Sequence, residues 1–151
     1  MEIKEIKPMN FLYFSTETKI SELSSFVSRV ARALHLEAAK LDLDVTGPIY
    51  WNYFGFAGDV NQSFLLEISL PVGEIPANYR GEFRFKRADK FKCLSARHEG
   101  SWYELPKTYG ALMQYIVSHQ LQPTFTNREL YINCDFKDPL ANVTEIQMGI
   151  N

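Results

Sequence analysis

One carboxylate in the last third of the chain stands where a charged group needs an explanation. Glu129 lies in the run Arg128-Glu129-Leu130-Tyr131-Ile132, whose alternation and β-branched and aromatic content predict a strand. Burying a carboxylate without a partner costs on the order of several kcal/mol, so Glu129 needs hydrogen-bond donors or a wet cavity. A carboxylate walled by aromatic rings is a receptor for an organic cation.

Strand alternation predicts which aromatic rings accompany this carboxylate. In a strand over about 124–133, Glu129 and Tyr131 share one face, whereas Leu130 and Ile132 share the other. We expect Leu130 and Ile132 to face a helix layer, which would place Glu129 in a cleft on the face without helices. A surface ion pair is the alternative role for Glu129.

An internal repeat with an offset of 75 to 78 residues adds two more rings to that face. The closest match is Glu67-Ile68-Ser69-Leu70-Pro71 against Glu145-Ile146-Gln147-Met148-Gly149. The offset places Trp51 and Tyr53 at positions equivalent to Glu129 and Tyr131, so we expect all four in one concavity. Simple packing is the alternative for Trp51 and Tyr53. Glu67 and Glu145 become equivalent carboxylates, which either share a proton near a pseudo-twofold axis or form separate salt bridges.

The pattern of each half predicts the order strand, helix, strand, strand. The first half gives 10–15, 21–41, 49–56 and 63–70; the second gives 90–98, 106–119, 124–133 and 143–150. We therefore predict an α+β fold of two βαββ units sharing a core within a single domain, 1–151. Repeat one spans about 8–73 and repeat two about 89–151. The basic stretch between them, about 74–88, is expected to be a solvated connector rather than a phosphate-binding patch.

Other features of the composition exclude several classes of function. The formal net charge of −2 gives no pull on nucleic acid or an anionic membrane, and no apolar run approaches the roughly 20 residues of a membrane span. The three histidines and two cysteines show no metal-ligand spacing, so we expect no metal and no cofactor. His98 is assigned a structural hydrogen bond. No targeting segment is visible, which predicts a cytoplasmic protein with reduced cysteines.

These motifs together resemble a known family. The run His98-x-Gly100-x-Trp102, the helix after it, Glu129-Leu130-Tyr131 and Thr144-Glu145-Ile146 resemble the GyrI-like (gyrase-inhibitor-like) small-molecule-binding domain. That effector-binding superfamily also forms the C-terminal domain of AraC-type and MerR-type multidrug-responsive regulators of bacteria. In the first half, residues 47–53 and 66–72 are similar to the family's strands. The similarity covers nearly the whole chain.

The resemblance implies a curved antiparallel sheet with helices on one side and a ligand cleft between the halves. It also implies that a mid-strand glutamate, here Glu129, meets the ligand. Trp102 stands where the family usually has tyrosine, which keeps a ring and removes a hydroxyl. The expected ligand-binding residues are therefore Trp51, Tyr53, Trp102, Glu129 and Tyr131.

Three functions follow from the resemblance for what we expect to be a stand-alone domain without direct nucleic-acid binding. The first is binding of an amphipathic, cationic or planar aromatic small molecule. The second is hydrolysis of reactive cyclopropane-containing natural products, with Glu129 as the catalytic base and Tyr53 or Tyr131 as hydrogen-bond donor. The third is interaction with DNA gyrase or a separate regulator.

Overall fold

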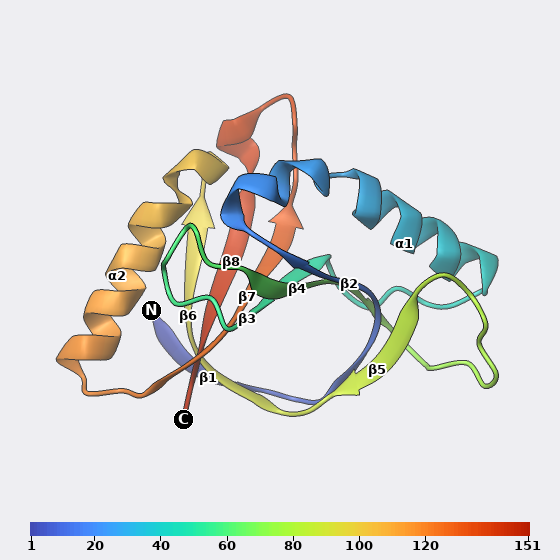
Figure 1. The fold of residues 1–151 in the computed structure, drawn as a ribbon, viewed down its shortest axis with the longest axis horizontal. Coiled ribbons are helices and arrows are strands. Elements are labelled where there is room, and N and C mark those ends of the chain that lie inside the picture. The colour runs from blue at the N-terminus through green and yellow to red at the C-terminus, as the bar shows by residue number, and fades with distance from the viewer.

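Eight strands form a single curved antiparallel sheet, and both α-helices lie on one of its faces (Figure 1). The computed structural model describes all 151 residues. In chain order the elements are β1 (Glu2–Ile6), β2 (Met9–Thr18), the 3-10 helix η1 (Ile20–Ser25), α1 (Arg29–Lys40), β3 (Tyr50–Phe54), β4 (Phe64–Val72), β5 (Arg84–Ala88), β6 (Phe91–Glu99), η2 (Trp102–Glu104), α2 (Leu105–Ser118), β7 (Pro123–Asn133), η3 (Pro139–Ala141) and β8 (Val143–Ile150). No helix combines the length and apolar character needed to cross a membrane.

The two halves meet at a pseudo-twofold axis in the middle of the sheet. The strand order is β1-β6-β8-β7-β3-β4-β2-β5. Strands at equal distance from the two edges are equivalent in the repeat: β1 with β5, β6 with β2, β8 with β4 and β7 with β3. At the junction of β3 and β7, Trp51 pairs directly with Glu129, its own equivalent 78 residues later. The axis therefore passes between these two residues, and the predicted repeat and its α+β fold class are confirmed.

The edge strands are exchanged between the halves. β1 precedes β2 in sequence but pairs with β6, whereas β5 precedes β6 but pairs with β2. Lys4 on β1 lies opposite Cys93, and Lys86 on β5 lies opposite Phe11, which makes β1 and β5 equivalent strands. The prediction of a solvated connector over about 74–88 was therefore wrong for its last part. The basic residue Lys86 is not free for phosphate either, because it forms an ion pair with Glu67.

The helices bury their apolar stripes on the outer strands of each half. Leu34 and Ala38 of α1 pack with Leu66 and Leu70 of β4, in a cluster that also contains Leu12 of β2. Leu112 and Ile116 of α2 pack with Leu94 of β6 and with Ile146 and Met148 of β8. Each fully buried leucine contributes about 1.5–3 kcal/mol, so these contacts fix the helices over the outer strands. The central strands β3 and β7 are left without a helix directly above them.

The first helix is shorter than the periodicity predicts. A continuous helix was expected over 21–41, but η1 ends at Ser25 and α1 begins at Arg29. Between them Ser28 has a positive φ of 67°. The serines of this segment offer the backbone other hydrogen bonds, as when the Ser25 hydroxyl donates to the Glu22 carbonyl at 2.8 Å. Their competition weakens the helix here, and the break turns Val27 and Ser28 toward the sheet centre.

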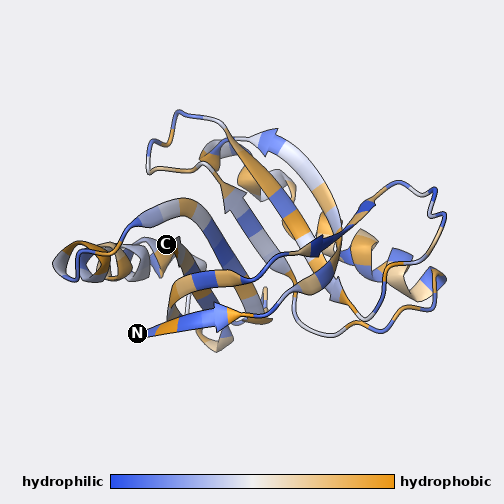
Figure 2. Cartoon of the chain, turned by 90° about the horizontal axis from the view of Figure 1, so that it is seen from below, coloured by the Kyte–Doolittle hydropathy of each residue, from blue (hydrophilic) through white to orange (hydrophobic).

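The predicted alternation along β7 holds, but the predicted faces were reversed. Leu130 packs against Phe11 and Tyr50 on the face without helices, whereas Glu129 lies on the helix face. Alternating hydrophilic and hydrophobic residues along the strands are visible in Figure 2. The sheet curves enough to bring Phe11 of β2 across β4 to the ring of Tyr50, with centroids 5.1 Å apart. That curvature builds a small core on the face without helices, which is where Leu130 finds its apolar partners.

A bulge at the start of β7 brings this strand unusually close to β8. The register shifts between Pro123 and Asn127, and Phe125 within the bulge has a positive φ of 61°. Gly149 of β8 lies against the bulge. A Cβ added there would overlap the Thr124 side chain and sit 2.5 Å from the Thr126 carbonyl oxygen. The absence of a side chain at position 149 therefore permits the bulge.

We predict that Gly149→Ala lowers the free energy of unfolding by about 1–3 kcal/mol, because backbone rather than a flexible side chain must move. Urea denaturation followed by tryptophan fluorescence measures it. Gly110→Ala in α2 is the matched control: a Cβ there meets nothing within 4 Å. An alanine in the helix should be neutral or stabilise by up to about 1 kcal/mol. Equal stability of the two variants would contradict the close approach at Gly149.

Candidate functional site

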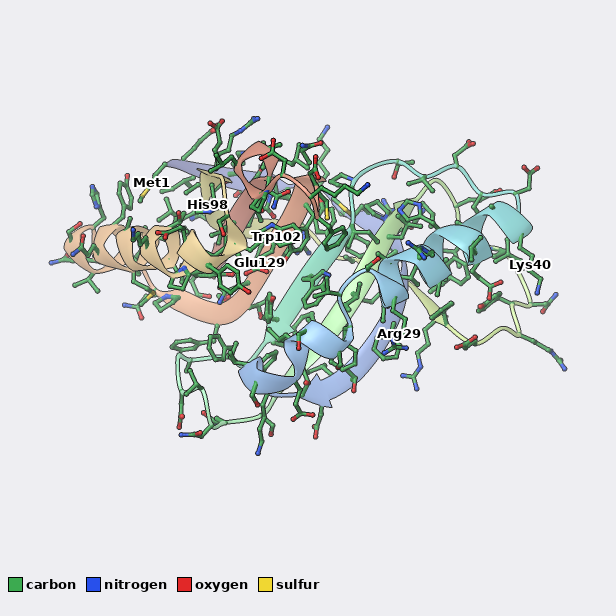
Figure 3. The ribbon with its side chains drawn as sticks, turned by 90° about the horizontal axis from the view of Figure 1, so that it is seen from above. Met1, Arg29, Lys40, His98, Trp102 and Glu129 are labelled. Atoms are coloured by element: carbon green, nitrogen blue, oxygen red, sulfur yellow. The ribbon has the colours of Figure 1, made fainter.

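A large cavity lies between the two helices, with the central strands as its floor. Its volume is about 1070 Å³, and most of the residues lining it are hydrophobic. α1 and α2 form its walls, and β3 and β7 supply Trp51, Tyr53, Glu129 and Tyr131. Figure 3, seen from the helix side, shows Trp102 and Glu129 between the helices. The cavity exists because the helices cover only the outer strands.

Three tyrosine hydroxyls hold the carboxylate of Glu129. Tyr53 and Tyr131 donate to Oε1 at 2.8 and 2.7 Å, and Tyr109 of α2 donates to Oε2 at 2.6 Å. All three are ordinary O–H···O distances, and an ionised carboxylate, which only accepts, suits three hydroxyl donors. Glu129 is 5% exposed and forms no ion pair with any lysine or arginine of the chain. The negative charge is therefore solvated by neutral donors alone.

Burial and the hydroxyls act in opposite directions on the proton affinity of this group. Burial raises the pKa of Glu129, and the hydrogen bonds from Tyr109, Tyr131 and Tyr53 lower it without cancelling the rise. Burial next to Glu129 also raises the pKa values of all three tyrosines well above the usual range. The tyrosines thus stay protonated as donors, and within this cluster of four side chains Glu129 is the one that gains or loses a proton.

Aromatic rings surround the carboxylate on the sheet side. The ring of Tyr131 makes edge contacts with both tryptophans, 6.0 Å from Trp51 and 5.8 Å from Trp102 between centroids. Trp102 is also fixed by its indole N–H, which donates to the Thr144 hydroxyl at 3.2 Å. Phe136 makes an edge contact with Trp102 at 5.5 Å. The cavity therefore presents ring faces and edges around one buried negative charge.

The His-x-Gly-x-Trp run positions one of these rings. Nε2 of His98 lies 2.8 Å from the Ser101 carbonyl, which only accepts, so Nε2 carries the hydrogen; Nδ1 then accepts from Thr108 at 2.8 Å. Gly100 turns the chain with a φ of 110°. These contacts tie the turn after β6 to α2 and place Trp102 over β8. The predicted structural role of His98 is confirmed.

All five residues expected to meet a ligand line this one cavity: Trp51, Tyr53, Trp102, Glu129 and Tyr131. Tyr109 was missed as a partner of Glu129. The signal for it was present, since Tyr109 brings a hydroxyl to the otherwise aliphatic face of the second helix. Asn127, buried on the cavity floor, was also missed.

The other paired carboxylates lie elsewhere and do not share a proton. β3 and β7 separate Glu67 on β4 from Glu145 on β8. Each carboxylate instead binds a lysine of an exchanged edge strand, Lys86 for Glu67 and Lys4 for Glu145. Of the two roles considered, separate salt bridges is the one observed. No cluster of three or more His, Cys, Asp or Glu side chains has the arrangement of a metal site.

The raised pKa of Glu129 predicts a particular pH dependence of stability. A folded carboxyl with a raised pKa binds its proton more tightly than the unfolded chain does. The contribution of Glu129 to the free energy of unfolding therefore falls as pH rises from about 4.3, the ordinary glutamate pKa, through the pKa of the folded state. Glutamine does not titrate, so Glu129→Gln lacks this fall. The free energy of unfolding of the variant, relative to that of the native chain, should therefore rise from pH 4 to pH 8, as measured by urea denaturation at each pH.

Glu145 supplies a control of opposite sign. Burial raises its pKa, but hydrogen bonds from Gln147, Lys4 and Ser95 outweigh this and leave the pKa lowered. The free energy of unfolding of the native chain should therefore increase relative to that of Glu145→Gln as pH rises from the lowered folded pKa toward the ordinary glutamate value. A relative stability of Glu129→Gln that stays constant with pH would refute the raised pKa.

Comparison with solved structures places this architecture among known folds. The C-terminal domain of EcmrR superposes with a TM-score of 0.83 at 20% identity, covering 99% of this chain and 96% of that one. The EcmrR chain in a complex with DNA matches at 21% identity and a TM-score of 0.82. That match covers 99% of this chain and 56% of the longer EcmrR chain. This chain thus spans little more than half of the length of EcmrR in that complex.

Two more distant structures share the fold. SAV2435, solved bound to tetraphenylphosphonium, matches at 12% identity and a TM-score of 0.68, covering 99% of this chain and 93% of that one. A protein described as a hydrolase encoded by lin2189 of Listeria innocua matches at 14% identity and a TM-score of 0.67. The match covers 99% of this chain and 91% of that one. The search of curated proteins found no match.

The sequence profile of one family fits nearly every residue. The profile of the GyrI-like small molecule binding domain matches residues 1–150, which includes every strand of the sheet and all the residues around Glu129. The chain therefore belongs to the GyrI-like small molecule binding domain family.

Proposed function

We propose that this domain binds an amphipathic organic cation, with Glu129 facing its charge and Trp51, Tyr53, Trp102 and Tyr131 packing on its apolar parts. One observation carries the proposal: Glu129 is a buried carboxylate in an apolar cavity and has no cationic partner in the chain. A bound cation supplies the counter-charge that the protein lacks.

The energetics favour a cation over a neutral ligand. Two opposite charges about 4 Å apart attract by about 4 kcal/mol at an effective dielectric constant near 20. Each ring face on the cation adds about 0.5–2 kcal/mol. The tyrosine hydroxyls already occupy both oxygens of Glu129, so the ligand needs no N–H donor. A bulky cation with its charge spread over apolar groups suits such a site.

The comparisons support this assignment at the level of the fold. The solved complex of SAV2435 contains tetraphenylphosphonium, a cation of this chemical kind, in a related architecture. A cavity of about 1070 Å³ has room for a molecule of several rings. Tetraphenylphosphonium is therefore a suitable first probe, and triphenylphosphine oxide is a neutral comparator of similar shape.

We predict that Glu129→Gln weakens tetraphenylphosphonium binding at least tenfold, a loss of about 1.4 kcal/mol or more. Its effect on triphenylphosphine oxide should be less than threefold, because only the cation loses a counter-charge. Isothermal titration calorimetry at pH 8, well above the ordinary glutamate pKa of about 4.3, measures both affinities.

Glu99→Gln removes the same charge from the exposed end of β6, outside the cavity, and should leave both affinities unchanged. An equal loss for the cation and the neutral compound in Glu129→Gln would rule out recognition of charge by this residue.

A second candidate function uses the same carboxylate as a catalytic base. Its raised pKa makes it a stronger base than an ordinary glutamate, and a protein described as a hydrolase has the same fold. In this mechanism Glu129 takes a proton from water while the water oxygen bonds to a carbon of a strained cyclopropane ring. The ring bond between that carbon and its neighbour breaks, and its electron pair moves onto a carbonyl oxygen conjugated to the ring. A hydroxyl of Tyr53 or Tyr131 donates a hydrogen bond to that oxygen.

If this mechanism operates, the protein accelerates water addition to a cyclopropane-containing alkylator, and the rate rises with pH as Glu129 ionises. Glu129→Gln should then lower the rate by about 10²–10⁴-fold, the usual contribution of a general base. Mass spectrometry of the ring-opened product follows the reaction. A rate equal to that in buffer would eliminate hydrolysis of this class. Interaction with gyrase or a separate regulator stays a prediction from the sequence.

A further inference from the structure

The two helical walls of the cavity are equivalent in position but differ in charge. The α2 wall presents Leu105, Pro106, Tyr109 and Met113. The α1 wall presents Ala31, Arg32 and His35, together with Val27 and Ser28 just before the helix. The repeat offset of 78 matches Leu34 of α1 with Leu112 of α2, both fully buried, so the two helices are in phase. It therefore matches His35 with Met113 and Arg32 with Gly110. The basic character of one wall is not part of the repeat.

Arg32 has no counter-charge within the protein. It takes part in none of the four ion pairs and in no side-chain hydrogen bond of the structure. Its helical neighbours three and four positions away are Ser28, Arg29, His35 and Leu36, none of them acidic. Glu129, the single carboxylate lining the cavity, is buried on the floor and enclosed by tyrosines, whereas Arg32 is exposed at the wall.

We propose that the α1 wall is a subsite for an anionic group of the ligand, formed by Arg32 and His35. The ligand is then amphoteric: a cationic aromatic body over Glu129, joined to a carboxylate, sulfonate or phosphate that reaches the α1 wall. The proposal rests on the function proposed above and narrows its ligand class. Arg32 offers a planar set of N–H donors that matches a carboxylate, and His35 offers a ring nitrogen one helical turn further along.

Desolvation explains why the two charges take these places. A delocalised cation loses little hydration when it enters an apolar cavity, and the buried Glu129 compensates that loss. A carboxylate or sulfonate is strongly hydrated, so it is best placed where water still reaches it, beside the exposed Arg32. A simple monocation, by contrast, meets Arg32 as a like charge. An amphoteric ligand turns that repulsion into attraction.

Tetramethylrhodamine and its methyl ester test the subsite, because they share one cationic ring system and differ only in a free or esterified carboxylate. Fluorescence anisotropy gives both affinities at pH 7.5. We expect the free acid to bind at least threefold more tightly than the ester. Arg32→Gln should weaken binding of the free acid by about threefold to fivefold, the effect expected of an exposed ion pair. The affinity for the ester should stay unchanged or increase. His35→Gln should act in the same direction with a smaller effect.

Arg29→Gln is the matched control, because Arg29 carries the same charge on the exposed first turn of α1 and does not line the cavity (Figure 3). It should change neither affinity. Acid and ester of equal affinity, or an equal effect of Arg32→Gln on both, would overturn the anionic subsite while leaving the proposed function intact. An ester that fails to bind, or binds Glu129→Gln as well as the native chain, would overturn the proposed function and the subsite with it.

Discussion

A single negative charge held in an apolar cavity by neutral donors is the constraint on which the rest of this structure depends. The three hydroxyls that solvate Glu129 come from β3, from β7 and from α2. The arrangement forms only when the two halves of the sheet are joined and the second helix is seated. If any donor were displaced, Glu129 would keep its burial and lose part of its solvation. Fold and site are therefore stabilised by the same contacts, and the cavity stays open because α1 and α2 rest on the outer strands.

The pseudo-twofold arrangement explains where this charge lies. A residue on the axis of a duplicated sheet pairs with its own equivalent, so identical residues there would place two carboxylates or two indoles side by side. The chain has instead Trp51 facing Glu129, which combines one charge with one ring. The same divergence recurs on the walls, where His35 corresponds to Met113. Exchange of β1 and β5 ties each half to the other half's outer strand, so an asymmetric cavity is carried by a symmetric frame.

The two faces of the sheet treat charge differently, and this division determines which face can receive a ligand. On the face without helices, Glu67 and Glu145 are paired with lysines, and the Arg128 guanidinium lies 4.1 Å from the Phe91 ring centroid beneath the curl of the sheet. Burial there lowers the pKa of Arg128. Each of these charges contacts a side chain of the protein itself. On the helix face Glu129 and Arg32 have no counter-charge within the chain, and both line the cavity.

The sequence by itself determined the repeat, the strand alternation and the identity of the residues that share a face, because these depend on spacing along the chain. It therefore grouped Trp51, Tyr53, Glu129 and Tyr131 correctly, and the His98-Gly100-Trp102 run added the second indole. Only the tertiary structure decided which face these residues occupy. Apolar Leu130 satisfied either face, and the curvature that gives it Phe11 and Tyr50 as neighbours arises from pairing across many strands. The exchange of β1 and β5 was equally hidden, since short charged edge strands differ little from a solvated connector in composition. The donor role of Tyr109 depended on the rotation and seating of a helix, which no local pattern fixes.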